Sequence, residues 1–248
     1  MISGFFCLSD VGLKRAENQD AWSADPAGGF FLVSDGMGGL NAGGVAAKAV
    51  AEVLPRMLAQ NIGALPKRTD RAVREAVKET VAQFSASLRE RAKGNPALSG
   101  MGATLALVLH QGGRVHIAHV GDSRVYLLAR GRLRRLTRDH NIVAVMLALG
   151  KITKEEAAVH PSRHALSRYV GMGGRAAADA RTIRPKTEGR LLLCTDGLTG
   201  MLDDEKIRAA LEQEAEPASA CLRLVAEAKA AGGLDNVTAM VVDVGPGE

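Results

Sequence analysis

Aspartates lie at several places where an apolar run begins or ends. Asp35 follows the run FFLVS, Asp122 follows VHIAHVG, and Asp196 follows LLLCT. Asp235 lies in GGLDNVT, before the segment VTAMVVDV, and Asp20 precedes a shorter run. One aspartate in such a position is a common turn residue. Several aspartates in such positions indicate a possible site if packed sheets bring the strand ends together.

Clustered carboxylates repel one another unless a cation neutralises them. Oxygen ligands suit Mg²⁺ or Mn²⁺ better than Zn²⁺, and the six histidines and three cysteines show no zinc-binding spacing. Two hard ions about 3.5–4 Å apart are a recurring device for phosphoester chemistry. The acids therefore raise the hypothesis of a dinuclear metal site, provided that the strand ends converge.

Short strands are the elements that would position these acids. Apolar runs bounded by Gly, Asp or Asn predict strands over residues 4–9, 21–24, 30–34, 103–110, 115–120, 125–129, 133–136, 190–194 and 237–242. The segments HQGGRV and ARGRL predict hairpins. Hairpins pair their strands antiparallel.

Helical spacing of apolar residues predicts the helices, over residues 43–61, 70–93, 203–214 and 217–231, with another beginning after 153. Asp70 is expected as an N-cap, and Thr153 with Glu156 as a capping box. Pro55 is expected to kink its helix, and Gly232 to end one. Strands and helices come in blocks, which favours an α+β fold of mainly antiparallel sheets flanked by helices.

Composition predicts one soluble cytoplasmic domain over residues 1–248, because no linker-like stretch divides the chain. Three cysteines without paired spacing argue against a disulfide framework and favour a reducing compartment. The first residues, MISGFFCLSDVG, do not have the pattern of a signal peptide, and no apolar run approaches the ~20 residues of a membrane span. We therefore expect no membrane association.

The net charge of +5 is unevenly spread, since residues 130–190 hold 14 Lys and Arg against 5 Asp and Glu. This segment is either a basic surface beside a site for an anionic substrate or a solvated arginine-rich face. Nucleic-acid binding is not expected, because only 3% of residues are aromatic and no nucleic-acid motif occurs.

The order of the motifs resembles one known family. The motifs are RAENQD (15–20), DGMGG (35–39), GATL (102–105), GDSRVY (121–126), LTRDH (136–140), LLLCTDGL (191–198) and GGLDNVT (232–238). This ordered set resembles the metal-dependent protein phosphatases, the type 2C serine/threonine phosphatases, in their compact bacterial form. The resemblance runs from about residue 4 to residue 244 and implies a four-layer α-β-β-α sandwich.

The resemblance also implies roles for individual residues. Asp35 and the carbonyl of Gly36, with Asp196 and Asp235, match the ligands of two Mn²⁺ or Mg²⁺ ions. Asp122, sharing Asp196, matches a ligand of a third, weaker ion.

Two further residues match family positions beside the metals. Asp20 matches the acid that holds water at the metals. Arg15 matches the arginine that contacts the substrate phosphate, for which a guanidinium fork is suited. The implied reaction is direct hydrolysis by a metal-activated water. Cys194, beside Asp196, has apolar neighbours that indicate an inert buried thiol rather than a nucleophile.

Residues 141–180 match the family's variable flap beside the active site, which favours substrate contact for the basic segment. The candidates in this flap are Arg163, Arg168 and Arg175. His119 and His140 are interpreted as structural residues.

This chain departs from the family at three positions. It has Met37 where some relatives carry a histidine proposed as general acid, so protonation of the leaving group falls to water or another residue. Leu40 and Gly44 replace the His and Glu of many bacterial members.

The function favoured by the resemblance is hydrolysis of phosphoserine and phosphothreonine in proteins, opposing a bacterial Ser/Thr kinase, by a monomer. One alternative is a catalytically silent member acting as a regulatory binding module. Another is a phosphatase whose target is a small phosphoester or a phosphorylated anti-sigma antagonist. Every expected metal-binding acid is present, which argues against the silent member.

Overall fold

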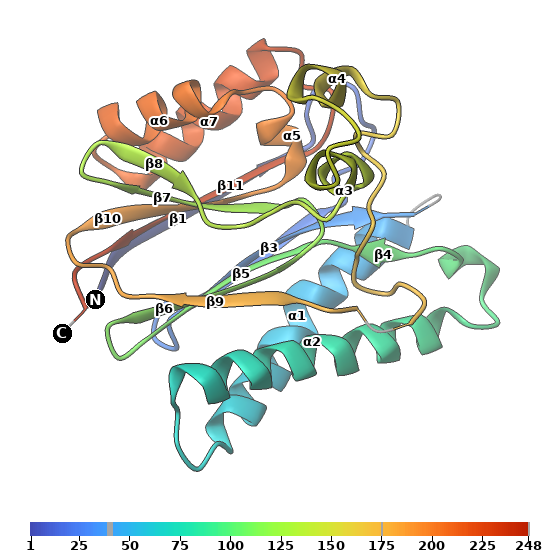
Figure 1. Cartoon of the computed structure of the whole chain (residues 1–248), viewed down its shortest axis with the longest axis horizontal. Helices are drawn as coiled ribbons and strands as arrows, with labels where there is room; N and C mark the ends of the chain where they lie inside the picture. Colours follow the sequence, from blue (N-terminus) through green and yellow to red (C-terminus); the bar gives the residue numbers. More distant parts are fainter. Residues whose placement is uncertain (39–41, 175, 248) are drawn as a thin grey trace.

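Two antiparallel sheets stack face to face with helices on both outer faces (Figure 1). This computed structural model describes residues 1–38, 42–174 and 176–247. The elements are, in chain order, β1 (Ile2–Asp10), β2 (Asp20–Asp25), β3 (Phe30–Met37), α1 (Ala42–Gly63), α2 (Asp70–Ala92), a 3₁₀ turn (Pro96–Leu98), β4 (Gly102–Ala103), β5 (Leu105–Gln111), β6 (Arg114–Val120), β7 (Arg124–Ala129), β8 (Arg132–Arg135), α3 (Ile142–Ala148), α4 (Lys154–Val159), β9 (Asp179–Ile183), β10 (Gly189–Cys194), α5 (Asp196–Thr199), α6 (Asp204–Gln213), α7 (Pro217–Ala230) and β11 (Val237–Val244).

The sheets have the strand orders β1-β11-β10-β7-β8 and β2-β3-β5-β6-β9, with β4 paired to β3. The strand pairs in the described residues are antiparallel. Helices α6 and α7 cover the first sheet and α1 and α2 the second (Figure 1). The predicted α-β-β-α sandwich is confirmed.

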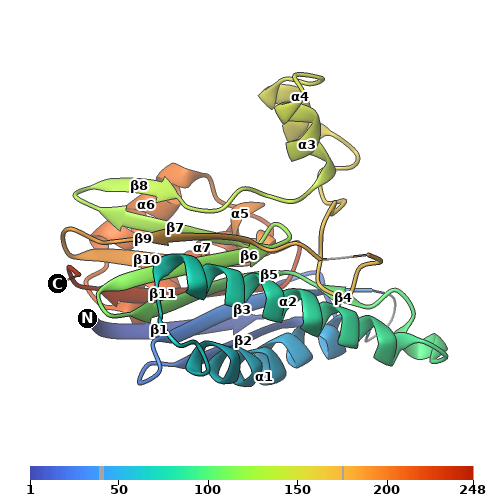
Figure 2. The ribbon, with the colours of Figure 1, turned by 60° about the horizontal axis from the view of Figure 1, so that its bottom comes forward.

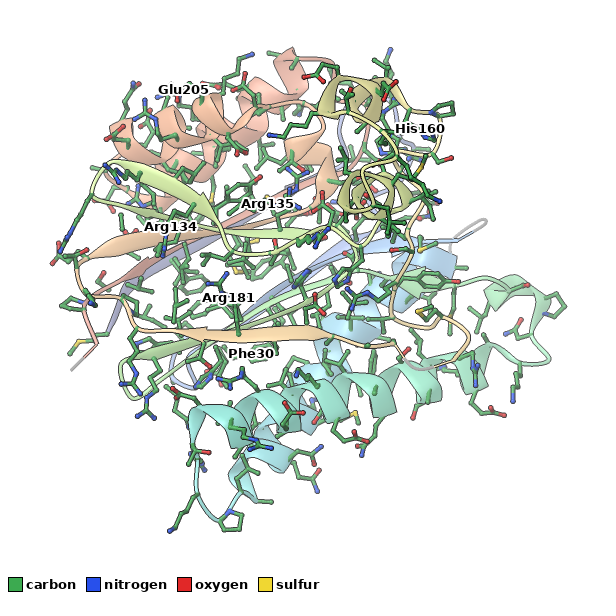
Figure 3. All side chains as sticks on the ribbon, viewed as in Figure 1. Phe30, Arg134, Arg135, His160, Arg181 and Glu205 are labelled. Carbon is green, nitrogen blue, oxygen red and sulfur yellow. The ribbon has the colours of Figure 1, made fainter. Side chains whose placement is uncertain are left out.

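The alternation of side chains along β3 explains how a continuous apolar run builds two layers at once. Phe30 and Leu32 pack in the cluster that contains α1 and α2, and Phe31 and Val33 pack between the sheets. The label in Figure 3 places Phe30 on the helix side of its sheet. A strand buried on both faces is fixed in register, so Asp35, which follows the apolar run within β3, arrives at a defined place.

All nine predicted strands are present, and the segment 103–110 is divided at Thr104 into β4 and β5. Both hairpins are confirmed. Strand β9 and the helices α3 and α5 were not predicted.

The prediction that Asp70 is the N-cap of α2 is wrong. Thr69 has the extended backbone of a cap, and its hydroxyl accepts the N–H of Ala72, whereas Asp70 already belongs to the helix. The capping box of Thr153 and Glu156 is confirmed.

Helix α1 continues through Pro55. Gly232 follows the C-cap Ala231 of α7 with a φ of 137°. None of the helices in the described residues is both long enough and apolar enough to span a membrane.

Candidate metal centre

A cleft of about 1510 Å³ opens where the strand ends of both sheets meet. Of the seven residues expected in the site, six line this cleft: Arg15, Asp35, Gly36, Asp122, Asp196 and Asp235. They come from the β1–β2 loop, the end of β3, the β6–β7 turn, the start of α5 and the loop before β11. The convergence on which the metal hypothesis depended is therefore present.

Asp35 is held at the end of β3 by its backbone. Its N–H donates to Thr104 Oγ1 at 2.9 Å, and its carbonyl accepts from the N–H of Thr104 at 2.8 Å. The next residue is glycine because the start of α1 packs against it: a Cβ on Gly36 would lie 2.2 Å from the carbonyl oxygen of Gly43. Gly38 has a φ of 141°, which favours glycine.

Asp196 begins α5, with one residue between it and the end of β10. Its Oδ1 is buried and has no hydrogen-bond partner, and its Oδ2 lies 3.4 Å from Nδ1 of His164. Asp122, only 7% exposed, follows Gly121 in the turn between β6 and β7.

Asp235 accepts a hydrogen bond from Arg15 Nη2 at 2.7 Å, and the Arg15 side chain is 57% exposed. The neighbouring Asn236 fixes the loop that carries Arg15. Its buried side chain donates to the carbonyls of Val11 and Glu17 at 2.9 and 2.8 Å. The sequence indicated no role for Asn236, although the DN motif marked its position.

Asp20 does not line the cleft, and it pairs with Asp35 between the neighbouring strands β2 and β3. Its Oδ2 accepts from the hydroxyls of Thr195 and Thr238 at 2.9 and 2.6 Å. Its Oδ1 is buried and unpartnered. The two threonines, which the sequence analysis also missed, therefore fix one oxygen of Asp20 and leave the other available.

Burial and crowding raise the pKa values of three of these aspartates. Burial, opposed by the two threonine hydroxyls and reinforced by the neighbouring carboxylates, raises the pKa of Asp20 to about 7. Burial, together with Asp196, raises the pKa of Asp122 to about 8. Burial and the nearby Asp20 hold the pKa of Asp35 well above its usual range. A divalent cation would remove the cost of ionising these groups.

The donor set fits a hard divalent cation, because unpartnered buried oxygens of Asp20 and Asp196 face a cluster of carboxylates. In the described residues, no three cleft carboxylates each place one oxygen within 4.8 Å of the oxygens of the other two. Ligands divided between two ions need no such compact group.

Residues 141–180 form one wall of the cleft. Helices α3 and α4 of this segment stand away from the sandwich (Figure 2), and His160, labelled in Figure 3, ends α4. Arg163 and His164 line the cleft. The sequence analysis missed His164, since nothing in its neighbours pointed to Asp196.

Other candidates have different surroundings. Arg168 donates to Asp179 and to the carbonyl of Ala177. Arg175 and Leu40 lie outside the described residues. Cys194 is fully buried, and burial raises its pKa to about 12, which agrees with an inert thiol.

A family profile described as "Protein phosphatase 2C" matches residues 14–231. The chain belongs to the protein phosphatase 2C family. This phosphatase 2C chain is 39% identical over 246 residues to the serine/threonine protein phosphatase PstP of Mycobacterium tuberculosis, covering 98% of the chain and 45% of the relative. The chain thus spans about half the length of that relative.

A phosphatase 2C relative of similar length is the serine/threonine phosphatase stp of Listeria monocytogenes, which is 33% identical, with 95% of this chain and 93% of the relative covered. Among solved structures, the catalytic domain of PstP in complex with two manganese ions superposes with a TM-score of 0.77 at 34% identity, with 98% of each chain covered. The manganese ions belong to that PstP structure.

Proposed function

We propose that the protein hydrolyses phosphoserine and phosphothreonine in other proteins, using Mn²⁺ or Mg²⁺. The observation that carries the proposal is the meeting of Asp35, Asp122, Asp196 and Asp235 on one cleft, with a buried oxygen of Asp196 unpartnered. Membership of the family and relatives named serine/threonine phosphatases support the activity.

Asp35, the Gly36 carbonyl, Asp196 and Asp235 would hold two ions, and Asp122 with Asp196 a third. When bound, such ions lower the pKa of a water and stabilise charge on phosphoryl oxygens. Asp20 would offer its unpartnered Oδ1 as a hydrogen-bond acceptor to a water at the ions. The reaction consumes one water and releases the serine or threonine hydroxyl and inorganic phosphate.

The flap, residues 141–180, would be a subdomain that contacts the protein substrate. Arg163 supports this role because it lines the cleft and carries a permanent positive charge suited to a phosphorylated peptide. The substrates would be products of a Ser/Thr kinase, and the enzyme would act as a monomer in the cytoplasm, where its free thiols at Cys7, Cys194 and Cys221 stay reduced.

Hydrolysis of a phosphothreonine peptide should depend on added Mn²⁺ and stop with EDTA. Asp196→Asn and Asp235→Asn should each abolish this activity, and hydrolysis of p-nitrophenyl phosphate, while circular dichroism remains native. Phosphate release measures the rate. Metal-independent turnover would refute the mechanism. A protein that binds Mn²⁺ and phosphopeptide but hydrolyses nothing would be the silent binding module.

Arg15→Ala should raise KM for a phosphopeptide by about tenfold or more and change kcat less. Charge-assisted hydrogen bonds of this type contribute about 1.5–3 kcal/mol, and 1.4 kcal/mol corresponds to a factor of ten. Lys14→Ala is the matched control, since Lys14 is the exposed neighbouring cation. Steady-state kinetics measures both constants, and an unchanged KM in Arg15→Ala would count against phosphate binding.

A further inference from the structure

His140 holds the turn that carries Asp122 from two directions. Its backbone N–H donates to the carbonyl of Gly121 at 3.0 Å. Its Nδ1 accepts the N–H of Gly121 at 3.2 Å. His140 is 3% exposed, and Gly121 has a φ of 96°. A buried imidazole, that of His140, therefore holds Gly121 in a backbone conformation that favours glycine, in the turn just before Asp122.

The other ring nitrogen of His140 points to the start of β9. Since Nδ1 accepts a hydrogen bond, the proton of the neutral ring is on Nε2. Nε2 donates to Asp179 Oδ2 at 3.2 Å. Both nitrogens of His140 are thus engaged, one to the Asp122 turn and one to Asp179.

Residues near the end of the flap contact both Asp179 and His140. Arg168 Nη1 donates to Asp179 Oδ1 and to the carbonyl of Ala177, both at 2.9 Å. The N–H of Ser167 donates to the carbonyl of His140 at 2.8 Å. The flap is therefore fastened to the same histidine that holds the Asp122 turn.

The same residues could be interpreted as a metal site, because single ligand atoms of His119, His140 and Asp179 lie within 4.8 Å of one another. Their existing contacts oppose this. His119 Nε2 is 2.7 Å from the carbonyl of Arg138, and its ring stacks on His140 with centroids 4.5 Å apart. The guanidinium of Arg168 already neutralises Asp179, the only anion of the three. A hydrogen-bonded chain describes the group better than a cation site.

We propose that Arg168, Asp179 and His140 form a positioning relay that fastens the flap to the Asp122 turn and fixes the Asp122 carboxylate for a divalent ion. The inference rests on the metal role proposed for Asp122. Residues that support a metal ligand through hydrogen bonds typically change metal affinity about 10- to 100-fold when they are replaced. None of the three relay residues lines the cleft.

The test is Mn²⁺ binding at equilibrium, measured from the electron paramagnetic resonance signal of free Mn²⁺. Asp179→Asn is the main variant because the Asp179 side chain is 52% exposed and its replacement leaves no buried gap. Asp122→Asn reports the site itself. Asp70→Asn is the matched control, since Asp70 pairs with Arg184 beyond the opposite end of β9.

We expect Asp122→Asn to remove the weakest class of Mn²⁺ site and Asp179→Asn to weaken that class about tenfold. The tighter classes in Asp179→Asn, and all classes in Asp70→Asn, should remain within about twofold of the unchanged protein. Wild-type binding in Asp179→Asn overturns the relay, and so does equal weakening in Asp70→Asn, which would mean general loosening. Unchanged binding in Asp122→Asn overturns the metal assignment and the relay with it.

A second measurement separates the two halves of the relay. His140→Asn retains an acceptor near Nδ1, whereas His140→Gln retains a donor near Nε2. The amide proton of Gly121 should exchange with solvent much faster in His140→Gln than in His140→Asn, as measured by NMR. Equal exchange in the two variants, both shown to be folded by thermal denaturation, would contradict the assignment of Nδ1 as the clamp on Gly121.

Discussion

Asp35→Asn is expected to slow phosphopeptide hydrolysis by about a thousandfold, which corresponds to ~4 kcal/mol of transition-state stabilisation. Asp35 would help to hold the two ions, and the neutral amide of asparagine has no negative charge to offer them. Phosphate release at saturating Mn²⁺ measures the loss. The thermal midpoint should rise with Mn²⁺ in the unchanged protein and rise much less in the variant, because binding to the native state stabilises it.

The metal-free variant should fold normally. Burial and the neighbouring acid hold the pKa of Asp35 well above its usual range, so the metal-free fold favours the protonated, neutral carboxyl over the charged one. An asparagine of the same shape replaces it at little cost. Asp25→Asn at the opposite end of β2 is the control and should retain full activity. Full activity in Asp35→Asn would refute the metal assignment.

The second large effect is a loss of stability of the metal-free protein as pH rises from 6.5 to 8. Burial and neighbouring carboxylates raise the pKa of Asp20 to about 7 and of Asp122 to about 8. In the unfolded chain these groups have lost their protons by pH 6.5. The native state binds more protons than the unfolded state, so raising the pH favours unfolding until the folded pKa values are passed.

Each pKa unit corresponds to about 1.4 kcal/mol, so Asp20 and Asp122 together should lower the free energy of unfolding by roughly 2 kcal/mol between pH 6.5 and 8. Urea unfolding in EDTA at pH 6.5, 7.2 and 8.0 measures this change. The range begins at 6.5 because burial lowers the pKa of His140 to about 4, which adds an opposite dependence in acid.

Saturating Mn²⁺ should remove most of this pH dependence and should stabilise the protein most at pH 8, where the ligands have lost their protons. Asp122→Asn should reduce the slope in EDTA, since one raised group is gone. A metal-free protein that gains stability from pH 6.5 to 8 would show that the crowded carboxyls do not control its folding.

Strands such as β3 could be predicted because a segment buried on both faces is apolar throughout, although β3 runs past the predicted end at residue 34 to Met37. Strand β9 could not, because DARTI is a half-exposed edge strand whose main reason to exist is pairing with β6, more than sixty residues earlier in the chain. Hydrophobic periodicity indicates which residues of a strand are buried, but it does not indicate which strand pairs with it.

The same limit applied to the site. The carboxylates of Asp35, Asp196 and Asp235 indicated metal chemistry. Their convergence depends on how the two sheets stack, and only the ordered family motifs indicated that stacking from the sequence. His164 and Asn236 were missed for this reason: each acts through a contact with a distant segment. Thr69 was missed as a cap because two capping residues stand side by side in the chain.

Ile2 pairs with Val244, so the first sheet can be completed only late in synthesis, when β11 has left the ribosome. Strand β11 lies between β1 and β10, and the residues just before it and within it, Asn236 and Thr238, fix the Arg15 loop and Asp20. A ribosome-bound chain lacking β11 must wait with two strand edges unpaired. The nascent protein is therefore expected to be inactive and prone to aggregation until almost the whole described chain has emerged.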